Sequence, residues 1–305
     1  MKAGYSMKSF TSHTIPAEQA GCTVEDYLKR ILQISGRKIQ KLTRQKGILI
    51  NRKPAFLEKK LKPGDILEVL TENDSAYGVS PEDGCLDILY EDSQLFVINK
   101  PPNTLVHPTG RTTGGTLANF LAAYLQKHRI VSAIRPLHRL DRDTSGCVIF
   151  AKNSHSQHLL ESQLKENTLK RTYWALVKGV PAELSQTICA PIGPHPSLPN
   201  RRSIIATGEP AITHYRTIAH GDTASLLELT LETGRTHQVR LHLAHIDCPI
   251  LGDSMYGAKS LWIKRQALHA IAVTFTDHTG KQITVQAPLP LDFNQAAEHA
   301  GITCP

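Results

Sequence analysis

The chain lacks any long apolar run. No stretch of its 305 residues approaches the roughly 20 apolar residues that a membrane-spanning helix needs. Residues 1–16 also lack the apolar centre of a signal peptide. We therefore expect neither membrane insertion nor secretion, and we predict a cytoplasmic protein.

Patterns for disulfides and metals are missing as well. The 6 cysteines lie far apart, without a Cys-x-x-Cys pair, and are interpreted as reduced thiols. His237, His242 and His245 invite a zinc hypothesis, but the helix lacks the His-Glu-x-x-His spacing and has no nearby carboxylate. We predict that the protein binds no metal.

Phosphate-binding glycine loops are absent from the sequence. Neither Gly-x-x-x-x-Gly-Lys nor a strand followed by Gly-x-Gly-x-x-Gly and a helix occurs. The sequence also shows no internal repeat. We therefore predict no nucleotide triphosphate or dinucleotide cofactor.

Positive charge is present and unevenly placed. The net charge is +8, and residues 22–72 hold 12 Lys and Arg against 6 Asp and Glu. A basic block of this kind suits a polyanion, whose counterions are released as Lys and Arg approach. It also suits a well-solvated surface, and charge alone does not decide between the two.

Composition divides the chain into four segments. Residues 1–21 show no clear periodicity and are interpreted as a loose arm or an edge strand. Residues 22–72 form the basic block, and residues 73–84 have the Gly, Pro, Ser and Asp content of a linker. Residues 85–305 are long enough for a domain with a core of its own.

The pattern of the basic block predicts two helices and short strands. Thr23 is a suitable N-cap for a first helix with one apolar face, made of Val24, Tyr27, Leu28, Ile31 and Leu32. A second, basic helix is predicted from Ser35 to Gly47, with Gly47 as a left-handed C-cap. Strands are predicted over 48–53 and 66–69.

The larger segment alternates strands with isolated helices. Strands are predicted over 87–92, 95–100, 147–151, 171–180 and 227–231, and helices over 154–167 and 236–246. Because repeated strand–helix–strand spacing is missing, we predict an α+β fold with a mixed, largely antiparallel sheet.

The clearest candidate for chemistry is the run His-Arg-Leu-Asp-Arg-Asp-Thr-Ser-Gly at residues 138–146. Asp141 lies there between two arginines, directly before an apolar strand. A carboxylate is ionised at neutral pH and a neighbouring arginine favours that form, so Asp141 suits nucleophilic attack without a separate base. The alternative for a lone Arg-x-Asp is a structural ion pair.

Asp143 is the rival carboxylate. The sequence from Asp143 to Gly146 also suits a tight turn in which the Asp side chain accepts backbone N–H groups, so we assign Asp143 a structural role. An aspartic protease needs Asp-Thr-Gly twice, and the sequence has neither that spacing nor that repeat.

The same run resembles the catalytic motif HRLDxxTSG of the RluA/RluD-type pseudouridine synthases. KPPNTLVHP at 100–108 resembles a second family motif, with Asn103 where glycine is usual. LKRTYWALVKG, TGRTHQVRLHLA and PILGDSMYG match further motifs in order. Residues 22–72 resemble the αL RNA-binding domain that many members carry. Asparagine tolerates positive φ, so the turn at Asn103 is expected to form.

The resemblance implies isomerisation of uridine in structured RNA, with Asp141 as the essential group. Tyr173 and Trp174 point to opposite faces of a strand, and the resemblance selects Tyr173 to stack on the uracil. Arg240 is expected to pair with Asp141 and Arg235 to bind RNA phosphate, although these two roles are exchangeable at this point.

Further RNA contacts are expected from the two domains. The resemblance and the basic helix together assign them to His138, Arg139, His237, Gln238, Arg37, Lys38, Lys41 and Arg44. We expect a monomer that acts on ribosomal RNA, with transfer RNA as the alternative substrate. A catalytically inactive RNA-binding assembly factor, and an RNA hydrolase that removes the base, are the rival functions.

Overall fold

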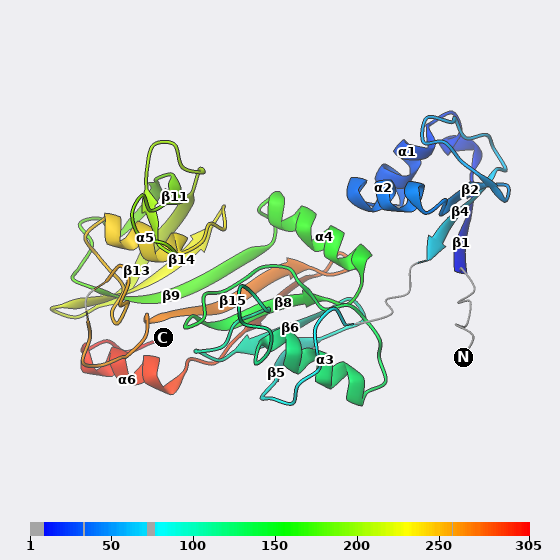
Figure 1. Cartoon of the computed structure of the whole chain (residues 1–305). Coiled ribbons are helices and arrows are strands. Elements are labelled where there is room, and N and C mark those ends of the chain that lie inside the picture. Colours follow the sequence, from blue (N-terminus) through cyan, green and yellow to red (C-terminus); the bar gives the residue numbers. More distant parts are fainter. Residues whose placement is uncertain (1–8, 33, 72–76, 258) are drawn as a thin grey trace.

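The computed structural model describes residues 9–32, 34–71, 77–257 and 259–305 (Figure 1). Residues 1–8 of the expected arm and residues 73–76 of the expected linker lie outside this part. The described residues pack around two main hydrophobic clusters that share no residue, one in each domain. No helix in these ranges is both long enough and apolar enough to cross a bilayer.

In the described residues, the N-terminal domain contains a four-stranded sheet, two short α-helices, a 3-10 helix at Ala17–Gln19 and a π-helix at Tyr27–Ile31. The strands lie in the order β1-β4-β2-β3. The elements are β1 Ser9–Thr14, α1 Val24–Asp26, α2 Gly36–Arg44, β2 Ile48–Ile50, β3 Lys53–Pro54 and β4 Ile66–Thr71.

Residues 9–21 belong to this domain. β1 pairs antiparallel with β4 along its whole length, which is the edge strand that was one of the two expectations. Ile15 follows it and is buried in the same cluster as Leu28 and Leu42. The expected boundary at residue 22 therefore falls inside a packed unit.

The first helix differs from its prediction after one turn. Thr23 caps it, since its side chain accepts a hydrogen bond from Asp26 N. From Tyr27 to Ile31 the winding widens to a π-helix, so Ile31 rotates away from the expected apolar face and is 45% exposed.

The second helix begins as predicted and ends differently. The Ser35 side chain accepts from Lys38 N and caps α2. Lys46, with φ 51°, is the left-handed residue after the helix, in place of the expected Gly47. Gly47 is needed for packing, because a Cβ there would lie 2.8 Å from Leu70 Cβ.

The strand expected over 48–53 is a hairpin. Asn51 and Arg52 have φ of 51° and 66°, the combination that a tight two-residue turn needs. The chain therefore reverses after β2, and β3 pairs back with it.

The larger domain contains a ten-stranded sheet. Its strands lie in the order β10-β13-β14-β9-β15-β8-β6-β5, while β16 pairs with β15 and β7 pairs with β8. The strands are β5 Asp87–Glu91, β6 Leu95–Lys100, β7 Arg135–Pro136, β8 Ser145–Ala151, β9 Lys170–Lys178, β10 Ser185–Cys189, β13 Ile212–His220, β14 Ala224–Leu231, β15 Leu268–Thr276 and β16 Gln282–Gln286.

The remaining elements are four helices and a small hairpin. They are α3 Leu117–Lys127, α4 Ser154–Lys165, α5 Gln238–His245, α6 Leu291–His299, β11 Ile192–Pro194 and β12 Arg202–Ile204. Among the strand pairs of the large sheet in the described ranges, only β15 and β8 run parallel. The predicted mixed, largely antiparallel sheet is confirmed.

β8 lies at the centre of this domain. Val148 and Phe150 pack into the cluster that contains α3, whereas Cys147 and Ile149 pack into the cluster that contains Leu160 of α4. Figure 1 shows these two helices on opposite sides of the sheet. Burial on both faces explains why the strand is an unbroken apolar run. The segment before it is thereby held against a rigid element.

Candidate active site

Asp141 lies in the loop between β7 and β8. Thr144 N donates to the Asp141 carbonyl at 3.2 Å and closes a turn. The Asp141 side chain is 26% exposed, so its carboxylate remains accessible. Gly146, with φ 108°, follows at the start of β8 and lies against the backbone of Ala270.

Lys100 holds this loop in place. It is fully buried at the end of β6, and its Nζ donates to the carbonyl oxygens of Pro101, Thr104 and Arg142, each at 2.8 Å. Burial lowers the pKa of Lys100 to about 7. Three acceptors match the three protons of an ammonium group, so these contacts favour the charged form that burial disfavours. Asn103 has φ 58° in the adjoining turn, as predicted.

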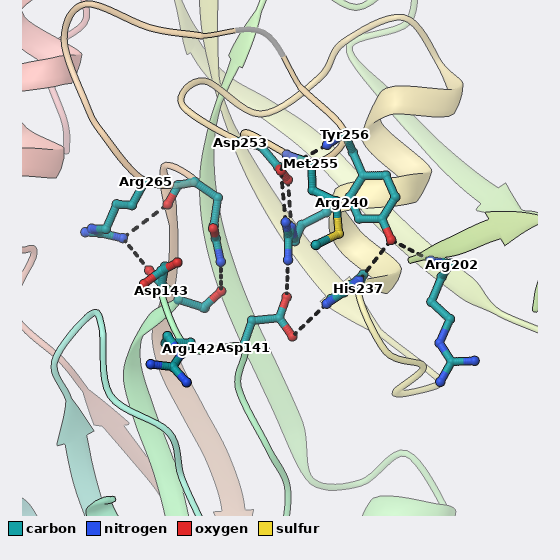
Figure 2. Close-up of polar contacts among 12 residues, drawn as sticks. Asp141, Arg142, Asp143, Arg202, His237, Arg240, Asp253, Met255, Tyr256 and Arg265 are labelled. Carbon is teal, nitrogen blue, oxygen red and sulfur yellow. Dashed lines mark hydrogen bonds and ion pairs between the residues drawn. The ribbon is translucent and has the colours of Figure 1, made fainter. Parts of the chain in front are cut away.

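Asp143 acts through its backbone. Arg265 Nη1 donates to the Asp143 carbonyl at 3.0 Å (Figure 2). Arg265 itself pairs with Asp292. In the part of the chain that the structure describes, the Asp143 side chain accepts no backbone N–H group. The expected side-chain turn is therefore wrong, although the structural role remains.

Arg240 links Asp141 to a second carboxylate, that of Asp253. Arg240 Nη1 donates to Asp141 Oδ2 at 3.0 Å, as expected. Its Nε and Nη2 bind Asp253 at 2.6 and 2.9 Å. Burial disfavours the charge of Arg240, but its hydrogen bonds to Asp253 and the charges of both carboxylates raise its pKa above the ordinary value. Arg240 is thus held as a fixed cation beside Asp141.

Asp253 is fixed in turn by the loop after α5. Its Oδ1 accepts from Met255 N at 2.9 Å and from Tyr256 N at 3.1 Å. Burial opposes the charge of this carboxylate, but the hydrogen bonds and charge of Arg240 lower its pKa. The bidentate pair orients the guanidinium so that one terminal nitrogen faces Asp141.

His237 lies beside the other carboxylate oxygen of Asp141. Its Nε2 is 4.0 Å from Asp141 Oδ1, and its Nδ1 lies 2.9 Å from the Tyr256 hydroxyl. That hydroxyl accepts from Arg202 N at 2.7 Å (Figure 2). When its own proton is donated to Nδ1, the imidazole proton lies on Nε2, toward Asp141. Burial lowers the pKa of His237, so the ring is neutral at physiological pH.

The helix that carries Arg240 begins two residues later than expected. His237 has φ 61° and lies outside the helix as a left-handed residue. Gln238 is 3% exposed, and its side chain binds Thr233, Ile212, Thr213 and Arg235 N. The structure therefore places Gln238 in the support of this turn.

Tyr173 and Trp174 point to opposite faces of β9, as predicted. Tyr173 is 4% exposed and packs in the cluster that contains Leu140. Burial raises the pKa of Tyr173, and the nearby charge of Asp141 adds to this effect. Trp174 Nε1 lies 3.5 Å from Glu228 Oε2 on the other face. Tyr173 is thus on the side of the sheet that holds Asp141.

The other expected RNA contacts have mixed positions. Arg139 is exposed beside the site, whereas His138 is buried, and its Nε2 accepts from Ile149 N at 3.3 Å. Arg235 pairs with Glu209 and donates to the Pro210 carbonyl, so Arg240 and not Arg235 meets Asp141. His138 is therefore no surface contact, because burial holds it under the loop.

The basic helix α2 presents three of its four selected side chains to solvent. Arg37, Lys41 and Arg44 are exposed. Lys38 is half-buried, and its Nζ donates to Ser154 Oγ at the start of α4 at 2.7 Å.

Sequence reasoning missed the residues that support the site. Lys100, Asp253 and Tyr256 all lie in segments whose resemblance was noted, but no role followed from their types alone. One signal could have indicated Asp253. A buried arginine such as Arg240 needs a carboxylate partner, and the Gly-Asp-Ser-Met-Tyr segment supplies one.

Comparison with known families matches both parts of the chain. The model of the RNA pseudouridylate synthase family matches residues 94–245, which contain Asp141, Tyr173 and Arg240. The model of the N-terminal domain of the ribosomal pseudouridine synthase RluD matches residues 11–67. The second match begins within β1, in agreement with the position of that strand in the small domain.

Similar proteins span nearly the whole chain. The uncharacterized RNA pseudouridine synthase YhcT of Bacillus subtilis is 40% identical over 91% of this chain and 93% of its own length. The ribosomal large subunit pseudouridine synthase D of Nitrosomonas europaea is 36% identical over 92% of this chain and 84% of its own.

A solved structure agrees with these matches. The human RNA pseudouridylate synthase domain containing 1 superposes with a TM-score of 0.57 at 27% identity, over 68% of this chain and 86% of that one. The fold, the order of the motifs and the arrangement around Asp141 thus agree with the sequence comparisons, and the chain belongs to the RNA pseudouridylate synthase family.

Proposed function

We propose that the protein converts uridine to pseudouridine in ribosomal RNA of the large subunit, with Asp141 as the catalytic group. The observation that carries this proposal is the accessible carboxylate of Asp141, held between the fixed cation of Arg240 and the neutral ring of His237. Ribosomal RNA is favoured because several relatives are named ribosomal large subunit pseudouridine synthase D. Transfer RNA is the second candidate.

The reaction breaks the bond between N1 of the uracil and C1′ of the ribose, and forms a bond between C5 and C1′. The proton on C5 leaves and N1 gains one, so no external oxidant or reductant is needed. Asp141 either attacks C1′ or assists the loss of the base. In both routes Arg240 keeps the carboxylate charged and directed, and Tyr173 supports the uracil.

Arg139 is suited to replace the extruded uridine. A uridine in a structured RNA leaves its stack at a cost of about a few kcal/mol. Arg139 is exposed two residues before Asp141, and its planar guanidinium can stack on bases and hydrogen-bond to them. Arg139→Ala should therefore lose much more activity on a folded RNA than on one whose target uridine is permanently unstacked. Equal losses would leave Arg139 as a simple phosphate contact.

Two experiments test the function. Pseudouridines are mapped across cellular RNA in a strain that lacks the gene and in strains complemented with the native protein or Asp141→Asn. We expect one or more large-subunit sites to vanish, to return with the native protein, and to stay absent with the variant. Loss from transfer RNA alone would favour the second candidate.

Product analysis then separates the chemistry from its rivals. Digestion of a treated RNA to nucleosides should give pseudouridine and no free uracil. Free uracil would indicate a hydrolase that removes the base, and unchanged uridine with tight RNA binding would indicate an assembly factor without chemistry. Since ribosomal RNA is the expected substrate, we expect the protein in the cytoplasm.

A further inference from the structure

Arg171 is a buried charge that the site described above does not use. It lies on β9 two residues before Tyr173, so both side chains are on the same face of the strand. Arg171 is 7% exposed. Arginine is rarely buried to this degree, and a buried charge normally has a partner, because removing it from water is costly.

No such partner exists for Arg171 among the residues that the structure describes. Its Nε is sealed from solvent and has no acceptor, and neither an ion pair nor a hydrogen bond links its guanidinium to this part of the chain. Two other arginines of this region behave differently. Arg240 binds Asp253 and Arg265 binds Asp292, each through two nitrogens.

The guanidinium of Arg171 lies at the turn that leads to His237. A Cβ built on Gly234 would be 3.2 Å from Arg171 Nη1, so the guanidinium lies directly against this glycine. Gly234 is exposed. Arg171 is therefore close to the surface at its tip and buried at its Nε, on the same side of the sheet as Tyr173.

A second unmatched donor accompanies it. His138 Nε2 accepts from Ile149 N, so the proton of the neutral ring is on Nδ1, which is buried without an acceptor in the described residues. Burial, with the charge of Arg171 as a further cause, lowers the pKa of His138 to about 3. The region thus offers a positive charge and an N–H group for which the described residues supply no acceptor.

We propose that Arg171 binds a backbone phosphate of the RNA beside the target uridine. The proposal rests on the proposed function in so far as RNA is the substrate. A planar guanidinium offers two parallel N–H groups to a phosphate, which is the strongest form of this contact. Gly234 has no side chain, so the phosphodiester can approach the tip of Arg171 closely. Along a strand, Arg171 is about 6.6 Å from Tyr173, which keeps the phosphate and the uracil in separate positions.

This assignment explains why the charge is unmatched in the protein alone. A carboxylate beside Arg171 would compete with the phosphate and repel the RNA. Arg171→Met keeps most of the side chain's volume and removes the charge. If the role is phosphate binding, the variant should unfold at an unchanged or higher temperature than the native protein, whereas a structural role predicts a lower one.

The first test uses inorganic phosphate alone. Thermal unfolding of the full chain is followed against phosphate concentration at constant ionic strength, with chloride as the balancing anion. The native protein should gain more stability from phosphate than Arg171→Met. Arg216→Met serves as the charge-matched control. It removes an exposed arginine of β13 that pairs with Glu228, and it should gain as much stability from phosphate as the native protein.

The second test uses an RNA hairpin that contains uridine. Arg171→Met should raise the Kd about tenfold or more, because hydrogen bonds between charged groups are among the strongest in proteins. It should also lower the slope of log Kd against log salt by about 0.7 to 0.9, the share of a single phosphate. KM should rise while kcat at saturating RNA changes less than about threefold.

Three results would overturn the proposal. An equal phosphate response in the native protein and Arg171→Met would show that the anion binds elsewhere or acts by general exclusion. A lower unfolding temperature with an unchanged Kd would make Arg171 structural. A lower kcat with an unchanged KM would show that Arg171 acts on charge developing at the uracil. If the native protein makes no pseudouridine on any RNA, the proposed function fails, but the phosphate test still decides the role of Arg171.

Discussion

Activity should depend on Asp141, whereas stability should not. Asp141→Asn keeps the shape of the side chain and removes its charge. Arg240 still pairs with Asp253, so the variant should fold with an unfolding temperature close to that of the native protein. Turnover, measured by tritium release from RNA labelled at C5 of uridine, should fall to background. Turnover that persists after deamidation has been excluded by mass spectrometry would contradict the assignment.

Two buried histidines should make the fold sensitive to acid. Burial lowers the pKa of His138 to about 3 and that of His269 to about 4. The unfolded chain takes up these protons near pH 6.5, and the folded chain does so only near the lowered values. Stability is therefore fully present above pH 6.5 and is lost as the pH falls toward 4, by up to about 1.4 kcal/mol per pH unit for each ring.

Urea unfolding of the native protein at several pH values between 7.5 and 4.5 measures this effect. His269 Nδ1 lies 2.9 Å from Ser145 Oγ, so His269→Gln retains a polar group at this position. The variant should be less stable at pH 7.5 and should show a flatter pH dependence. A native free energy of unfolding that stays constant from pH 6.5 to 4.5 would rule out the proposed linkage.

At the level of single residues, the sequence indicated the proposed catalytic groups better than the residues that support them. Asp141, Tyr173 and Arg240 followed from motifs whose order is specific. Lys100 and Asp253 did not, because their roles depend on contacts between distant segments, such as Lys100 Nζ with the Arg142 carbonyl. Local pattern carries no information on such pairs. Asp143 was assigned a side-chain role that its backbone carbonyl performs.

Among the elements, strands with a clear pattern were predicted well and helix ends were not. The apolar run of β8 and the cap of α2 follow from local physics, namely burial on both faces and the Ser35 hydroxyl. α3 was missed, although Thr116 and Asn119 form a capping box at its start. The π-helical turn at 27–31 could not be predicted, because tertiary packing and not local propensity decides such winding.

The end of α2 offers a prediction at this scale. Lys46 has φ 51°, where a side chain is strained and glycine is not. Lys46→Gly should therefore stabilise this domain by about 0.5 to 1 kcal/mol. Hydrogen exchange of the α2 amides measures the free energy of local opening. It is better suited than a global transition, since the two domains have separate cores.

Gly47→Ala is the matched control for this change. Its Cβ would lie 2.8 Å from Leu70 Cβ, and the clash should cost about 1 to 3 kcal/mol. A gain of stability in Lys46→Gly together with a loss in Gly47→Ala is expected if Lys46 is the left-handed residue and Gly47 the packing residue. A loss of stability in Lys46→Gly would instead restore the expectation that Gly47 is the left-handed residue.

At the scale of the whole molecule, charge and chemistry are divided between two domains. Residues 22–72 carry 12 of the 35 Lys and Arg with only 6 of the 27 Asp and Glu, while Asp141 and its partners lie in the larger domain. The uneven charge and the linker-like composition of residues 73–84 predicted this division, and the motif around Asp141 placed the chemistry in the larger segment. It misplaced the boundary because β1 contributes backbone pairing to the small sheet, and a six-residue edge strand leaves little periodicity to detect.

Removal of residues 1–75 should leave a folded domain that binds RNA more weakly. The main hydrophobic clusters of the two domains share no residue, so the larger core does not depend on the smaller one. Without the basic helix, log affinity should fall less steeply with log salt, by about 0.7 to 0.9 for each phosphate that the protein no longer binds.

In the full chain, Arg37→Ala with Arg44→Ala is the matched control, since both side chains are exposed on α2. The double variant should reproduce part of the change in slope and retain kcat on saturating RNA. An unchanged slope in both proteins would mean that α2 does not contact RNA, and the positive charge of the small domain would then serve only its solvation.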